Sequence, residues 1–200
     1  RILRDEHMED LQRLAGIASH AEGAGAALDA PVANRVMRRL PWLVLGLVGS
    51  SAITFVMMGF EDALAANVSV AFFVPALVYI AGAIGTQAVS VAVRALSNGD
   101  IALGPLLRDE IAIGLLIGLA LGLIAGGAVL GVTGDARLAL AVGLSVLAGG
   151  ALSSVVGFVL PWAFQRAGSD PALGSGPVCT IIQDAASLLI YFVIVSVLVL

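Results

Sequence analysis

Charged and redox-active side chains are scarce in this chain of 200 residues. Charged residues make up 12% of it, none of the ten basic residues is a lysine, and there is one cysteine. A single cysteine excludes an internal disulfide, and nothing indicates a metal cluster. The sequence has no basic patch to support nucleic-acid binding. It also has no catalytic triad, HExxH motif, P-loop or paired catalytic carboxylates, so we do not expect an enzyme.

Apolar residues are what the chain has in excess. They make up 60% of it, and the mean hydropathy is +1.05, which lies outside the range of soluble domains. Continuous apolar runs near the ~20 residues that cross a bilayer predict helices rather than strands. The fold class is therefore an all-α membrane protein with five transmembrane helices, expected at 41–60, 68–92, 111–132, 138–164 and 178–200.

The first forty residues differ in kind from the rest. Leucine and isoleucine recur among acidic residues over 1–18, which predicts a short amphipathic cytoplasmic helix, and the small residues of 21–30 predict a linker. We divide the chain into a connecting helix and linker, 1–40, and a transmembrane domain, 41–200. An acidic cluster in the first part is either a solvated face or a divalent-ion site: Asp5, Glu6, Glu9 and Asp10.

The placement of arginine predicts the orientation, because cytoplasmic connections are enriched in basic residues. Alternate connections carry most of them: Arg35, Arg38, Arg39, Arg94, Arg108 and Arg166. The only charged residues in the connection between the first and second spans are acidic, Glu61 and Asp62, and the connection between the third and fourth spans holds one arginine, Arg137. We expect a multi-pass protein of the cell membrane, with its N terminus in the cytoplasm and its C terminus outside.

One acidic residue lies inside the fifth apolar stretch. Asp184 follows Pro177 by about two helical turns, and no basic residue occurs between Arg166 and the end of the chain. A carboxylate in hydrocarbon costs about 3 kcal/mol, so it normally faces a bundle interior or an aqueous path. We predict that Asp184 is the cation site of a channel or transporter, and the alternative is a packing partner for Thr or Gln. Cys179 is interpreted as a small packing residue.

The second stretch combines proline, small residues and polar residues. Pro75 removes one backbone hydrogen bond and is expected to leave the carbonyl of Ala71 without its helical donor. Three polar side chains follow a run of small residues: Thr86, Gln87 and Ser90. Both a kinked packing helix and a functional face remain open.

Glycine recurs every four residues in the third stretch. The positions are Gly114, Gly118, Gly122 and Gly126. No lysine follows them and no strand precedes them, so they predict a helix-packing face and not a phosphate loop.

Several blocks of the sequence share a pattern with a known family. They are RRLPWLVLGLVGSS, GFED, FFVPALVYIAGAIGTQAVSVAVRAL, LLRDEIAIGLLIGLALG and GSDPALGSGPVCTIIQDAASLLIY. The most specific is DPAL-x-SGP, followed by an aspartate and then LLIY. Together they resemble the membrane domain of MgtE magnesium channels, a family related to animal solute carriers for magnesium, and the resemblance covers 38–200.

The resemblance implies a homodimer of five-helix subunits, with a pore on the dimer axis between the second and fifth helices. The pore carboxylate falls on Asp184, and pore-lining positions one and two turns earlier fall on Thr180 and Gly176. Asp170 is expected at the cytoplasmic mouth. The resemblance also implies cytoplasmic regulatory domains, absent from this chain, that act through a connecting helix. The chain departs from common family residues at Ala81–Ile84, Ser154, Gly176 and Ile181.

The expected function is that of a divalent cation channel. Two Asp184 carboxylates, one per subunit, match the charge of one Mg²⁺, which is both the bound and the transported ion. Magnesium sheds water reluctantly, so we expect it to be held through its water shell and released easily. The expected partners are Mg²⁺ or another divalent cation, the lipid bilayer and a second copy of the chain. The alternative is a secondary transporter that exchanges a divalent cation for Na⁺ or H⁺.

Overall fold

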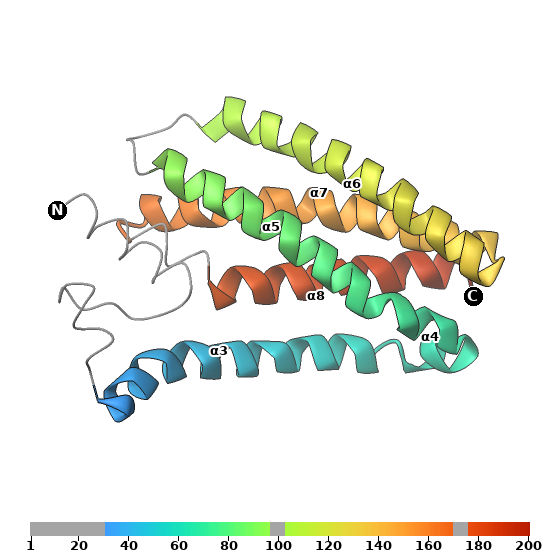
Figure 1. The fold of residues 1–200 in the computed structure, drawn as a ribbon, viewed down its shortest axis with the longest axis horizontal. Coiled ribbons are helices and arrows are strands. Elements are labelled where there is room, and N and C mark those ends of the chain that lie inside the picture. Colours follow the sequence, from blue (N-terminus) through green and yellow to red (C-terminus); the bar gives the residue numbers. More distant parts are fainter. Residues whose placement is uncertain (1–30, 97–102, 170–175) are drawn as a thin grey trace.

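The computed structural model describes residues 31–96, 103–169 and 176–200, which form helices and short connections without a strand (Figure 1). The predicted amphipathic helix at 1–18 and Asp170 lie outside this part of the chain. The elements are α3 (Val32–Met58), α4 (Glu61–Ala66), the 3₁₀ helix η1 (Val68–Phe73), α5 (Val74–Leu96), α6 (Leu103–Thr133), α7 (Ala136–Arg166) and α8 (Pro177–Leu198).

Five helical segments are long and apolar enough to cross a membrane, as the sequence predicted. They are Val32–Met58, Val68–Leu96, Gly104–Thr133, Ala136–Arg166 and Pro177–Leu198. The first begins at Val32, before the apolar stretch at 41–60, and Pro41 lies inside it. The arginine-bearing segment therefore continues the same helix, because a membrane helix can absorb the one backbone bond that proline removes.

Pro75 does not lie where the sequence placed it, in the interior of one continuous helix. It is the second residue of α5, directly after η1. The carbonyl of Ala71 lacks the α-helical donor that Pro75 cannot supply, as predicted, but it accepts the N–H of Val74 instead. The reason is that a 3₁₀ turn pairs each carbonyl with the residue three positions later, ahead of the proline. The hydroxyl of Tyr191 also donates to the carbonyl of Val70 over 2.8 Å and ties η1 to α8.

The predicted glycine face of the third span is confirmed as the surface on which α6 packs against α7. A Cβ added at Gly118 would lie 2.8 Å from the carbonyl oxygen of Leu147, and one at Gly122 would lie 2.5 Å from that of Gly143. Both distances are too short for carbon against oxygen, so only glycine allows these two backbones to approach this closely.

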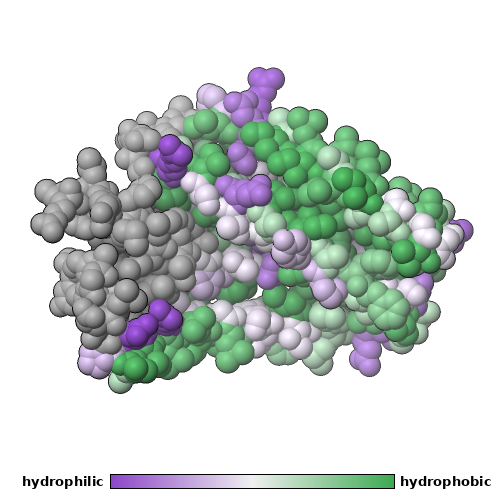
Figure 2. Space-filling view, in the orientation of Figure 1, coloured by the Kyte–Doolittle hydropathy of each residue, from purple (hydrophilic) through white to green (hydrophobic). Residues whose placement is uncertain are grey.

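Helix α7 holds the bundle together, because α5, α6 and α8 all pack against it, whereas α3 lies at the edge and contacts chiefly α8 (Figure 1). Four fully buried side chains mark the core: Tyr191, Phe192, Leu138 and Leu188. Figure 2 shows apolar side chains over much of the face seen in Figure 1, with less hydrophobic residues near its middle, where α5 crosses the front. This arrangement brings one polar face of α5 beside α8.

Candidate functional site

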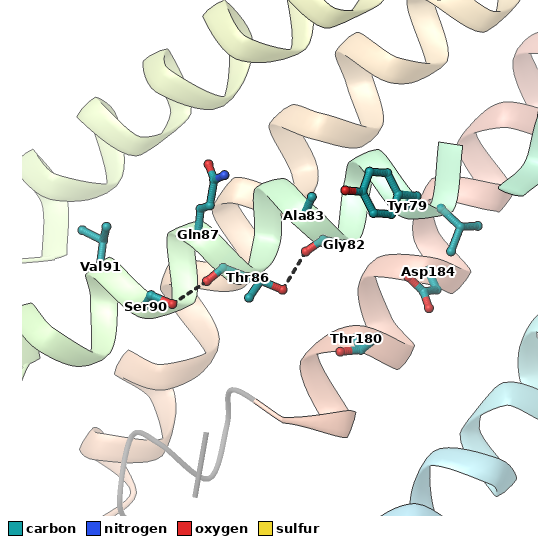
Figure 3. A pocket seen from close by; sticks show the side chains of 10 residues that line it. Tyr79, Gly82, Ala83, Thr86, Gln87, Ser90, Val91, Thr180 and Asp184 are labelled. Carbon is teal, nitrogen blue, oxygen red and sulfur yellow. Dashed lines mark hydrogen bonds between the residues drawn. The ribbon is translucent and has the colours of Figure 1, made fainter. Parts of the chain in front are cut away.

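A groove of about 940 Å³ runs between α5 and the first half of α8 (Figure 3). Two residues of α8, Thr180 and Asp184, line one wall of the groove. The rest of the lining comes from α5: Val78, Tyr79, Gly82, Ala83, Thr86, Gln87, Ser90 and Val91. Tyr79 is 76% exposed, so the groove is open along one side of the single chain. Asp184 is the charged member of this lining.

The α5 wall of the groove carries hydroxyl groups at four-residue spacing. The Thr86 hydroxyl donates to the carbonyl of Gly82 over 2.8 Å, and the Ser90 hydroxyl donates to the carbonyl of Thr86 over 2.9 Å. A hydroxyl bonded back to its own helix satisfies its proton and keeps its oxygen lone pairs for another partner. This face can therefore accept hydrogen bonds from water, which favours the functional interpretation of the second span.

The α8 wall carries the predicted carboxylate. Asp184 is half-buried, and a Cβ built at Gly82 would lie 3.9 Å from its Oδ1, so the glycine leaves the space beside the carboxylate free. Over the three described ranges, no hydrogen bond or ion pair to this carboxylate is found. The Ser187 hydroxyl donates to the backbone carbonyl of Asp184 and not to its side chain. The described residues therefore give no support to Asp184 as a packing partner for Thr or Gln.

Of the other predicted site residues, Thr180 shares the groove with Asp184 and Gly176 does not line it. Gly176 precedes α8, and its carbonyl accepts the N–H of Cys179 at 3.1 Å. The Thr180 hydroxyl lies 3.5 Å from the same carbonyl, to which it donates. The carbonyl of Gly176 is therefore bonded within the first turn of α8. Asp170 lies in the part of the chain that the structure leaves undescribed.

The predicted packing role of Cys179 is confirmed. It is a buried free thiol in a small apolar cluster with Val89 and Val93. Among the described residues, no three His, Cys, Asp or Glu side chains lie together as a metal-binding group. A cation at Asp184 would take its remaining ligands from water, from neutral oxygens or from another chain.

Sequence reasoning missed a buried acid, Glu110. Glu110 is 8% exposed, and the Ser154 hydroxyl donates to its Oε1 over 2.5 Å between α6 and α7. The sequence placed it in the polar connection before the third span. The available signal was spacing, because Glu110 continues the four-residue series of glycines that begins at Gly114.

A buried amide was missed as well. Gln183 is 3% exposed, and its Nε2 donates to the carbonyl of Ser153 on α7 over 3.1 Å. Only its place beside Asp184 in the sequence singles it out.

Comparison with known proteins gives consistent matches over this region. A family model named MgtE, described as a divalent cation transporter, matches residues 74–194. The magnesium transporter MgtE of Thermus thermophilus is 32% identical over 197 residues, which is 95% of this chain and 42% of that protein. That of Bacillus subtilis is 31% identical over 191 residues, covering 92% of this chain and 40% of the relative. The chain therefore spans about two fifths of the length of these curated relatives.

Proposed function

The chain belongs to the MgtE family of divalent cation transporters, and from this we propose that it carries Mg²⁺ across a membrane along the groove between α5 and α8. The family consists of transporters and not of enzymes. The five long apolar helices are those of a multi-pass membrane protein. The observation that carries the proposal is the placement of Asp184, whose carboxylate has no partner among the described residues and lines a hydroxyl-rich groove.

A second copy of the chain is part of this proposal. One chain supplies one negative charge, and its groove is open along the side that carries Tyr79. A two-fold axis along that opening would close the groove with the same two helices of the partner and bring a second Asp184 to it. Two carboxylates then match the charge of one divalent ion, and the bound ion in turn offsets their mutual repulsion.

The neutral oxygens of the groove suit a hydrated ion. Mg²⁺ keeps several waters in its shell, and those waters donate hydrogen bonds outward. The hydroxyl oxygens of Thr86, Ser90 and Thr180 and the carboxylate of Asp184 are acceptors for them. Contacts through water are weak enough for the ion to leave, which conduction requires.

Uptake of Mg²⁺ into liposomes that contain the purified protein tests the proposal. Wild-type protein should conduct down a Mg²⁺ gradient, with no Na⁺ or pH gradient imposed, and empty liposomes should not. Uptake that requires an opposing Na⁺ or pH gradient would replace the channel with the exchanger expected as its alternative. No uptake under either condition would overturn the transport proposal.

The two-fold arrangement has its own test. Single cysteines placed near Thr180, in a background without Cys179, should cross-link between two copies in the membrane. A protein that is a functional monomer in mild detergent would contradict the shared groove.

A further inference from the structure

Beside the carboxylate of the groove lies a side chain that points the other way. Asp184 is half-buried and lines the groove, whereas Gln183 is 3% exposed and faces the inside of the bundle. Successive residues of an α-helix point about 100° apart around its axis. Whatever fixes the direction of Gln183 therefore also fixes the direction of Asp184.

Helix α7 holds the Gln183 amide from one side. Its Nε2 donates to the carbonyl of Ser153 over 3.1 Å, and the Ser153 side chain is 1% exposed. A buried amide that lost this acceptor would bear the desolvation penalty of an unpaired donor. Rotation of α8 that breaks the bond is therefore disfavoured.

Helix α5 confines the same amide from another side. A Cβ added to Gly85 would overlap the amide group of Gln183, so glycine provides the space that the amide fills. Gly157 of α7 lies against this point as well, since a Cβ there would be 2.6 Å from the carbonyl oxygen of Gly85. Three helices thus meet around the Gln183 side chain, one residue from the proposed ion ligand.

Helix α7 is in turn anchored at the same level. Ser154, the neighbour of the Ser153 that accepts from Gln183, donates to Glu110 of α6. The carbonyl that holds Gln183 therefore belongs to a turn of α7 that is bonded to helices on two sides.

From these contacts we infer that Gln183 is a positioning residue for ion binding: its amide, held by Ser153 and lodged against Gly85, sets the rotation of α8 that aims Asp184 into the groove. This inference rests on the proposed function of that groove. A glutamine that only stabilised the bundle would change the free energy of unfolding and leave the affinity for Mg²⁺ unchanged.

The variant Gln183→Met removes the amide and keeps an unbranched side chain of similar length. Gln165→Met is its matched control, because the Gln165 Nε2 also donates to a backbone carbonyl of another helix, that of Leu96, over 3.1 Å. Gln165 does not line the groove. Both variants and wild type are reconstituted in liposomes at matched density, and Mg²⁺ uptake is measured over a range of Mg²⁺ concentrations. Thermal unfolding in detergent is measured in parallel.

The inference predicts a split between the two glutamines. Gln183→Met should raise the half-saturating Mg²⁺ concentration about fivefold, the equivalent of one lost hydrogen bond. Gln165→Met should leave that concentration unchanged, although it also loses an interhelical bond. Gly85→Ala, which displaces the amide without removing it, should raise the concentration in the same direction and serves if Gln183→Met does not fold.

Asp184→Asn, measured in the same series, separates failure of the inference from failure of the proposed function. Loss of saturable uptake in Asp184→Asn, with wild-type half-saturation in Gln183→Met and Gly85→Ala, would overturn the positioning role alone. An equal shift in Gln183→Met and Gln165→Met would also overturn it. Wild-type uptake in Asp184→Asn would overturn the ion site and the positioning role together.

Discussion

Asp184 and Glu110, two acids on helices long and apolar enough to cross a membrane, have opposite surroundings. Glu110 lies between α6 and α7, nearly fully buried, and accepts the hydroxyl of Ser154. Asp184 lies between α8 and α5, half-buried in an open groove, and no described residue bonds to its carboxylate. The more buried acid is the one that the protein satisfies internally. Burial alone therefore does not mark a candidate ion site, whereas a missing partner beside an open space does.

The two helix pairs differ in the same way. Glycines bring α6 and α7 into backbone contact along a tight interface, whereas the glycine of α5 at position 82 leaves space beside a carboxylate. Substitutions in the tight interface between α6 and α7 should lower the stability of the protein. Substitutions in the groove between α5 and α8 should change stability little and should alter ion uptake instead.

The largest effect on stability should come from filling the tight interface. Gly122→Ala places a methyl group 2.5 Å from the carbonyl oxygen of Gly143, so the helices must separate, at a cost of about 2 kcal/mol. Gly127→Ala is the control on the same helix, because a Cβ there has no other atom within 4 Å. Thermal unfolding in detergent measures both, and equal unfolding temperatures would show that the packing is not tight.

A smaller loss of stability should follow from removing the satisfied acid. Glu110→Ala takes away the side-chain acceptor of Ser154 and leaves a gap between α6 and α7, which should cost about 1–2 kcal/mol. Glu110→Gln keeps an acceptor oxygen and should unfold close to wild type. Glu110→Gln should leave the half-saturating Mg²⁺ concentration unchanged, and a severalfold rise in that variant would assign Glu110 to ion binding instead.

The smallest effect should come from a single hydroxyl in the groove. Thr180→Ala removes one of the acceptors that we propose for the water shell of the ion, and it should raise the half-saturating Mg²⁺ concentration by no more than about fivefold. Thr54→Ala on α3 is matched to it, since each hydroxyl lies 3.5 Å from the carbonyl four residues earlier. An equal response of both variants would remove Thr180 from the ion path.

The features that depend on composition and residue spacing could be predicted from the sequence alone. Long apolar runs predicted five spans, the four-residue glycine series predicted the α6 packing face, and the absence of a nearby base singled out Asp184. Each of these signals lies within one segment of the sequence, so it can be recognised without knowing how the helices pack.

The sequence could not give what depends on contacts between distant segments. Glu110 looked like a residue of a polar connection because its partner, Ser154, lies on another helix. Gln183 looked like one more polar residue because its burial is set by α5 and α7. Pro75 lies at the start of α5 because a 3₁₀ helix precedes it, and the apolar pattern of the sequence does not distinguish a 3₁₀ helix from an α-helix.

The central claim is that the unpartnered acid, and not the satisfied one, binds the transported ion. Its most direct test is Mg²⁺ uptake by liposomes that contain wild type, Asp184→Asn or Glu110→Gln at matched protein density. Asp184→Asn keeps the volume of the side chain and removes its charge, so the protein should fold, and uptake should fall at least about tenfold because both carboxylates of the proposed dimer are lost. Glu110→Gln should retain wild-type uptake. Wild-type uptake in Asp184→Asn would contradict the account.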